Sequence, residues 1–300
     1  EDWWSADRPN KEAMVTQTLP YLVARVLDEE GRAADMKRLY AMRAALLLLD
    51  FTNESIESMK ELLLRCFVHP LFIKTVDGRK FCVYLFGLHP TLIADIHDTI
   101  KQQLPFCSKH MCELYGEIYF KAWRTASGPY LIRVETGCVQ DLMSAAVHAS
   151  TMSLFNALRR VLGAFHGQKK ARGVDEMLLR LYEPILWRAL TAANPHVRRS
   201  AATLLIDTFP LHDPDGSLEA MDVMLQKQFD CLRSLLTDST VAVRCVGVSG
   251  ICRVLCVYWE VIPPTTTRTF LELLVTQSAR DANAAAVRVA VCEGLGYLLD

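Results

Sequence analysis

The 300-residue sequence is poor in the residues that break secondary structure, with 12 prolines and 14 glycines. They fall mostly between apolar periodic stretches, and this favours an all-α chain. One segment also fits a β-hairpin. It consists of the apolar residues 71–76, the dipeptide Asp77-Gly78 and the apolar residues 80–88. We favour helix, turn, helix there, since no further strand is available to complete a sheet and a lone hairpin is marginally stable.

The sequence also lacks an excess of charge and a long apolar run. The formal net charge is −1, so nucleic-acid binding can come only from local clusters of basic residues. The fully apolar runs are short, as at residues 44–49, and fall well below the ~18–20 residues that cross a membrane. We therefore expect no membrane partner.

Motifs that carry out catalysis are missing as well. The sequence has no glycine-rich phosphate loop, no zinc-protease helix and no nucleophile elbow. Cys107, His110 and Cys112 could be metal ligands, but zinc needs three or four and no matching pair is near in sequence. We expect Cys112 to be buried and His110 exposed. The sequence thus predicts no enzyme, with no catalytic residue, metal, cofactor or small-molecule substrate.

Ten cysteines are scattered along the chain, many on predicted apolar helix faces. Cys245, Cys252 and Cys256 lie at steps of seven and four, in register with Trp259. We interpret these cysteines as small buried hydrophobic residues in a reducing compartment. The aromatic side chains of Tyr182, Trp187 and Trp259 are likewise predicted to lie in the core.

What the sequence does contain is one pattern that occurs three times in its last third. The pairs Val197-Arg198, Val243-Arg244 and Val287-Arg288 are 46 and 44 residues apart. A period of ~40–47 residues is typical of the two-helix units of HEAT and armadillo proteins. We therefore predict an all-α HEAT-repeat α-solenoid, a right-handed superhelix of antiparallel helix pairs.

Small residues follow each Val-Arg pair on the same helical face. Positions four, seven and eight after the valine lie on one face, and they are apolar or glycine in all three copies. Glycine inside a helix costs ~1 kcal/mol relative to alanine. We therefore expect Gly247, Gly250, Gly294 and Gly296 to be there because neighbouring helices pack closely on them.

The periodicity divides the chain into three parts. We expect an N-terminal extension and first helix over residues 1–30, irregular HEAT-like units over 31–173, and three clear repeats over 174–300 that continue into a longer solenoid. Asp175 is predicted to cap the helix that follows it. Predicted helices, besides those of the Val-Arg pairs, cover residues 11–29, 33–50, 54–67, 90–103, 108–126, 130–149, 154–166, 176–191, 217–236 and 265–279.

A basic cluster precedes the first clear repeat. Five positive charges and no acid lie between residues 159 and 172, partly in a loop bounded by glycines. Such a cluster can neutralise DNA phosphates, although a solvated helix end and loop would look the same. The candidate DNA-binding residues are Arg159, Arg160, Lys169, Lys170 and Arg172, with Arg199 extending the patch.

The arginines of the Val-Arg pairs have a different expected role. In HEAT stacks the corresponding arginine usually binds an acidic residue or a carbonyl group of a neighbouring unit. We therefore interpret Arg198, Arg244 and Arg288 as structural residues that tie units together.

Three segments resemble the G-type HEAT subunit family of condensin II: YGEIYFKAW at 115–123, YEPILWRAL at 182–190 and YWEVIPP at 258–264. The resemblance implies a non-catalytic scaffold that binds the kleisin subunit and, through it, a pair of SMC ATPases. It also implies contact with duplex DNA or chromatin, and a place on chromosomes in the nucleus during mitotic condensation. The alternative is a peptide-binding HEAT or armadillo adaptor in transport or signalling that does not contact DNA.

Overall fold

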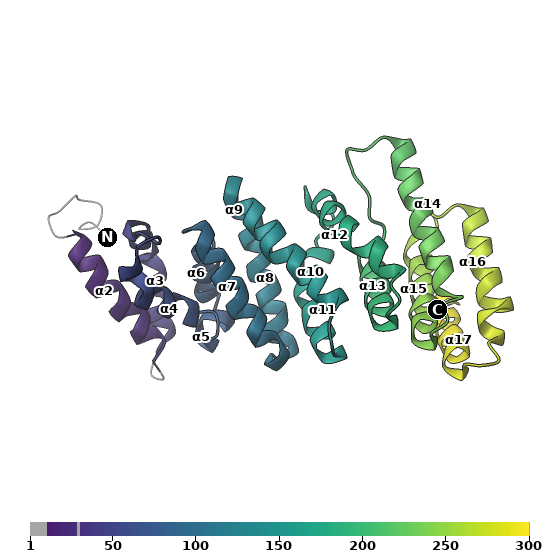
Figure 1. Ribbon diagram of the computed structural model, residues 1–300, viewed down its shortest axis with the longest axis horizontal. Helices are drawn as coiled ribbons and strands as arrows, with labels where there is room; N and C mark the ends of the chain where they lie inside the picture. Colours follow the sequence, from purple (N-terminus) through teal and green to yellow (C-terminus); the bar gives the residue numbers. More distant parts are fainter. Residues whose placement is uncertain (1–10, 29–30, 300) are drawn as a thin grey trace. The chain divides into compact units, whose positions relative to one another are not determined.

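The computed structural model describes residues 11–28 and 31–299, and there every regular element is a helix (Figure 1). The all-α prediction is confirmed for these residues, as is the choice of helix over hairpin at residues 71–88. Of the predicted N-terminal extension and first helix at residues 1–30, residues 1–10, 29 and 30 lie outside the described residues.

Two compact units make up the chain. The first comprises Glu1–Leu142 and Asn156–Phe165, and the second comprises Met143–Phe155 and His166–Asp300. The first unit holds α2 (Lys11–Val26), α3 (Ala33–Ala41), η1 (Arg43–Leu48), η2 (Glu54–Ile56), α4 (Glu57–Arg65), α5 (Pro70–Lys74), α6 (Val76–Leu85), α7 (Pro90–Gln103), η3 (Leu104–Phe106), α8 (Lys109–Thr125), α9 (Gly128–Ile132) and the π-helical η4 (Arg133–Val139).

The second unit contains the Val-Arg segments. Helices α10 (Gln140–Val147) and α11 (Met152–His166) have residues in both units. The remaining elements all belong to the second unit: α12 (Val174–Leu190), α13 (Pro195–Thr208), α14 (Leu218–Leu235), α15 (Val241–Tyr258), α16 (Pro264–Thr276), η5 (Ser278–Arg280) and α17 (Ala285–Leu299).

Several helices begin with a capping side chain followed by proline. His69, His89 and Asn194 each accept a hydrogen bond from a backbone N–H in the first turn of the next helix. The following proline has no N–H to satisfy, and its fixed φ suits the first helical position. These short sequence signals explain why α5, α7 and α13 start where they do.

The break between α5 and α6 differs from the predicted one. Thr75, not Asp77-Gly78, separates the two helices, and its Oγ1 accepts a hydrogen bond from Gly78 N at 3.1 Å. Asp77 and Gly78 instead form the first turn of α6. A Cβ at Gly78 would lie 2.2 Å from the carbonyl oxygen of Phe72, so glycine is needed for close packing rather than for a turn.

Other predicted helices are interrupted for local reasons. The predicted helix over residues 33–50 ends in the 3-10 helix η1, and the one over 130–149 contains the π-helical turn η4. In that turn the buried Glu135 accepts a hydrogen bond from Trp123 Nε1 at 2.9 Å. Asp175 does not cap α12, because Gly173, with φ of 79°, holds the N-cap position.

Helices α13, α15 and α17 pack side by side in the second unit, α15 against each of the others (Figure 1). A Cβ at Gly247 would lie 2.7 Å from Leu235 Cβ, and one at Gly294 would lie 2.5 Å from Cys252 Sγ. The packing role predicted for Gly247, Gly250 and Gly294 is confirmed. It is wrong for Gly296, where an added Cβ would meet nothing within 4 Å.

Helix α15 is longer and more apolar than the short apolar runs of the sequence suggest. Its 18 residues have a mean hydropathy of 1.7 and would pass as a membrane span by length and composition. In the structure Val248, Ile251 and Leu255 are fully buried, and α15 packs against α13 and α17. These contacts fit the core helix of a helical stack, whose inner helices are apolar on more than one side.

The cysteines are all free thiols, and several lie on the surface. Cys112 and Cys252 are buried, but Cys245 is only half-buried and Cys256 is exposed. Trp259, predicted to share their face in the core, keeps 47% of its surface exposed. The predicted burial is therefore wrong for Cys256 and Trp259, at the C-terminal end of α15.

Candidate interaction surfaces

Lys169, one of the predicted DNA-binding residues, keeps only 16% of its side chain exposed. Its ammonium group donates hydrogen bonds to the carbonyl oxygens of Thr208, at 2.7 Å, and of Pro210. It also lies 3.5 Å from the Asp175 carboxylate. Burial lowers the pKa of Lys169, and the Asp175 charge partly offsets this effect. Lys169 therefore fastens the start of α12 to the end of α13 and has little donor capacity left for phosphate.

The other predicted DNA-binding residues differ in exposure. Lys170 and Arg172 are exposed and belong to the second unit, as does the half-buried Arg199. Arg159 and Arg160 belong to the first unit and are also half-buried. Arg160 lies 3.5 Å from the Glu113 carboxylate. Of the cluster, Lys170 and Arg172 thus have the most exposed side chains.

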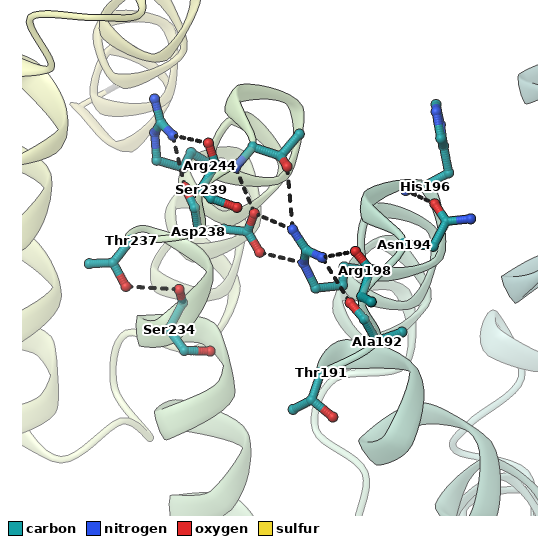
Figure 2. Close-up of polar contacts among 12 residues, drawn as sticks. Thr191, Ala192, Asn194, His196, Arg198, Ser234, Thr237, Asp238, Ser239 and Arg244 are labelled. Carbon is teal, nitrogen blue, oxygen red and sulfur yellow. Dashed lines mark hydrogen bonds and ion pairs between the residues drawn. The ribbon is translucent and has the colours of Figure 1, made fainter.

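Arg198 joins two successive helix pairs (Figure 2). Its Nε and Nη2 donate to the two carboxylate oxygens of Asp238 at 2.7 and 2.9 Å, a bidentate arrangement. Nη1 donates to the carbonyl oxygens of Ala192 and Ala193 at 2.8 and 2.9 Å. The guanidinium thus binds both the loop before its own helix and the α14–α15 loop of the next pair.

The second Val-Arg pair repeats this arrangement. Arg244 donates to Asp281 Oδ2 at 2.9 Å and to the carbonyl oxygen of Asp238 at 2.8 Å. In the third pair Arg288 donates to the carbonyl oxygen of Asp281 at 2.6 Å. The ion pairs Arg198–Asp238 and Arg244–Asp281 are both largely shielded from water. The arginine and aspartate side chains are 14% and 11% exposed in the first pair and 14% and 12% exposed in the second.

The aspartates that receive these arginines were not singled out from the sequence. The hydrogen bonds from Arg198 are the main reason why the pKa of Asp238 is lowered, and backbone N–H donation from Thr240 acts in the same direction. Asp238 and Asp281 lie just before the second helix of their pairs, at five and six residues before the arginine-pair valine, respectively. An acidic residue five or six residues before the valine in two of the three copies was a usable signal for the partner of the arginine.

The predicted core aromatics have mixed positions. Tyr182 is fully buried, and its hydroxyl lies 2.9 Å from His166 Nε2. Trp187 is half-buried, with the Lys227 ammonium 4.3 Å from its ring centroid. Trp259 is the exception described above. The two aromatics on α12 therefore serve packing, with Trp187 at its edge.

One buried polar network in the first unit has residue types that could serve catalysis. His97 Nδ1 lies 2.8 Å from the Tyr119 hydroxyl, and His97 Nε2 lies 2.9 Å from Asp141 Oδ2. Lys101 also donates to Asp141, at 2.6 Å. Burial lowers the pKa of His97. Because His97 and Tyr119 are both buried, no substrate reaches the pair. The network ties α7, α8 and α10 together.

The candidate metal ligands are placed as the sequence predicts. Cys112 is buried and His110 is exposed, beside Glu113 at 3.7 Å. No group of three or more potential metal ligands occurs within residues 11–28 and 31–299. The donor set at Cys107, His110 and Cys112 thus offers no arrangement that fits zinc.

Comparison with known proteins finds similarity to one family. A family model described as the condensin II non-structural-maintenance-of-chromosomes subunit matches residues 65–213. Along its full length the chain is 40% identical to condensin-2 complex subunit G2 of Danio rerio. The resemblance to the G-type subunit of condensin II is confirmed.

The condensin II relatives extend well beyond this chain. The human condensin-2 complex subunit G2 is 40% identical over 300 residues, which cover 99% of the chain and 26% of the relative. The mouse subunit G2 is 39% identical over 299 residues. The chain therefore spans about a quarter of the length of these relatives. The match to the condensin II family model includes parts of both compact units.

Proposed function

We propose that this chain is part of a non-catalytic HEAT-repeat scaffold subunit of condensin II. It binds the kleisin subunit, is linked through it to the SMC ATPase pair, and contributes to DNA binding during mitotic chromosome condensation in the nucleus. The observation that carries the proposal is the 40% identity to G2 subunits over the whole chain. The alternative, an adaptor that does not contact DNA, predicts no binding in the experiments below.

The structure supports the HEAT part of this proposal in the second unit. The pairs α12–α13, α14–α15 and α16–α17 each place a Val-Arg segment at the start of the second helix. Arg198 and Arg244 reach the loop of the following pair. We therefore propose that residues 174–300 are three HEAT repeats of a right-handed superhelix, and that residues 31–173 are irregular units of the same kind.

Kleisin binding is tested by purifying the chain together with separate segments of the condensin II kleisin. We expect one segment to elute with the chain in a 1:1 complex on size-exclusion chromatography, because a helical solenoid presents an extended surface to a flexible partner. Equivalent segments of an unrelated kleisin are the control. If no condensin II segment elutes with the chain, this stretch of the subunit does not hold the kleisin.

DNA binding is tested by reversing the two most exposed charges of the basic cluster. The double substitution Lys170→Glu and Arg172→Glu is expected to weaken binding to a short DNA duplex. The slope of log affinity against log salt should fall by about 2, since each lost phosphate contact removes ~0.9. Arg268→Glu is the matched control, because its side chain is 82% exposed and far from the cluster in sequence.

Separate variants distinguish the contributions of the individual members of the basic cluster to DNA binding. Lys169 is left unchanged in this test because its substitution would disturb the packing of α12. Arg159 and Arg160 are reversed in a separate variant, since they belong to the first unit. An unchanged salt slope in both variants would contradict the basic-cluster proposal, whereas a wild-type chain that does not bind DNA at all would favour the adaptor.

A further inference from the structure

A groove in the first unit has a composition that the proposed function does not use. It encloses about 470 Å³ between α3, α6 and α8 and the residues that follow them. Among the described residues that line it, two are cationic, Arg43 and Lys80, and none is acidic. Its apolar lining includes Val83, Phe86, Ala122 and Ala126.

Arg43 is held in place by aromatic rings rather than by an acid. Its guanidinium carbon lies 4.1 Å from the ring centroid of Tyr40 and 5.5 Å from that of Tyr84. Nη1 donates to the Tyr40 carbonyl oxygen at 2.9 Å. Arg43 is half-buried and forms no ion pair with any residue in the described part of the chain. It is therefore a fixed planar cation whose remaining N–H donors suit a carboxylate.

The other polar groups of the groove add to the positive potential. The Lys80 ammonium lies 5.9 Å from the Tyr40 ring centroid, with Asp77 the nearest acid at 3.7 Å. Burial raises the pKa of Tyr84, so this phenol stays neutral at physiological pH. The groove thus combines two cations with an apolar wall, and only the Lys80 charge is partly balanced.

We propose that this groove docks a short acidic segment of a protein partner, with a carboxylate on Arg43 and an adjacent apolar side chain against Val83 and Ala126, which are both half-buried. Charge complementarity favours an anion, and the apolar wall favours a peptide over a free anion. Arg43 already occupies a face of Tyr40, which leaves less ring surface for the base stacking that single-stranded nucleic acids use. The inference does not depend on kleisin or duplex binding.

The test measures fluorescence anisotropy with the full chain and three labelled probes. These are a peptide that alternates glutamate and leucine, its glutamine counterpart, and a single-stranded oligonucleotide of equal charge. We expect the glutamate peptide to bind at least ~10-fold more tightly than the glutamine peptide, because its carboxylates form charge-assisted hydrogen bonds. Arg43→Gln should remove that preference, and Lys80→Gln should reduce it several-fold.

Two further variants guard against a loss of folding. Arg43→Lys keeps the charge but loses the planar fork, so its affinity should fall between those of the wild type and Arg43→Gln. Lys74→Gln is the matched control, an exposed lysine of the same unit outside the groove, and should bind like the wild type. Thermal melting verifies that each variant is folded, and Lys80→Gln, with a side chain 51% exposed, keeps the test valid if Arg43→Gln is not.

Three results would overturn the proposal. The first is equal affinity for the glutamate and glutamine peptides. The second is full binding by folded Arg43→Gln and Lys80→Gln variants. The third is an oligonucleotide that binds as tightly as the peptide with the same dependence on Arg43, which would assign the groove to nucleic acid.

Discussion

Replacing Arg198 with alanine is expected to destabilise the second unit by about 3 kcal/mol. The substitution removes a bidentate bond to Asp238 and two hydrogen bonds to the loop that precedes α13. Hydrogen bonds to charged groups contribute ~1.5–3 kcal/mol each, but they are not additive when one side chain makes them all. The measurement is urea unfolding of the full chain followed by circular dichroism.

A double-mutant cycle separates the ion pair from the loop contacts. Asp238→Ala alone should cost about 2 kcal/mol. In the Arg198→Ala background it should cost only about 1 kcal/mol, because the shared bond is already lost and only the hydrogen bond from Thr240 N is left to remove. Arg268→Ala is the control, since its pair with Glu272 is exposed and is expected to contribute little to stability. Additive effects of Arg198→Ala and Asp238→Ala would contradict a direct link between the helix pairs.

The pH dependence of this effect has a definite sign. The pKa of Asp238 is lower in the folded protein than in the unfolded chain, chiefly because Arg198 donates hydrogen bonds to it. The pair therefore stabilises the fold fully above the unfolded pKa, about 4, and the stabilisation is lost as the pH falls through the folded pKa. The difference between wild type and Arg198→Ala should be constant from pH 6 to 8 and shrink below about pH 4.

Helices and repeat spacing could be predicted because their signals are local. The three Val-Arg segments begin α13, α15 and α17 as the 46- and 44-residue spacing indicates. Three of the four glycines singled out on these helices meet a neighbour at close range. The periodicity of the sequence thus predicts both where these three helices begin and which of their faces is buried.

Features that depend on contacts between distant segments could not be predicted in the same way. Lys169 looks like a free loop charge in the sequence, but its partners are the carbonyl groups of Thr208 and Pro210, about 40 residues away. The groove around Arg43 combines side chains from α3, η1, α6, α8 and α9. Neither arrangement follows a period, so no spacing rule could have revealed it.

Asp77-Gly78 shows how a local signal can be outweighed by packing. The dipeptide has the composition of a turn, yet both residues are helical because Thr75 caps α6 one turn earlier. Gly78 is required by the little space available to it: an added Cβ would lie 2.2 Å from the carbonyl oxygen and 2.5 Å from the Cα of Phe72. Both are backbone atoms of α5, which cannot rotate away as a side chain can.

Gly78→Ala is therefore expected to destabilise the first unit by about 3 kcal/mol. To admit the methyl group, α5 or α6 must shift, and the fully buried Phe72 would lose its packing. The gain in helix propensity, about 1 kcal/mol, offsets only part of this. Urea unfolding measures the change. Thr75→Ala, which removes the cap and the hydrogen bond from Thr75 Oγ1 to the Leu71 carbonyl oxygen, should cost about 1–2 kcal/mol.

Gly296→Ala is the matched control, and its expected effect on stability has the opposite sign. An added Cβ there meets nothing within 4 Å, so only the propensity gain remains and α17 should be stabilised by up to ~1 kcal/mol. Gly250→Ala should fall between the two, since its close neighbour is the end of the Ile206 side chain, which can move. The order Gly78, Gly250, Gly296 tests whether backbone contact, rather than the helical position of a glycine, decides its role. Equal effects at all three positions would contradict that explanation.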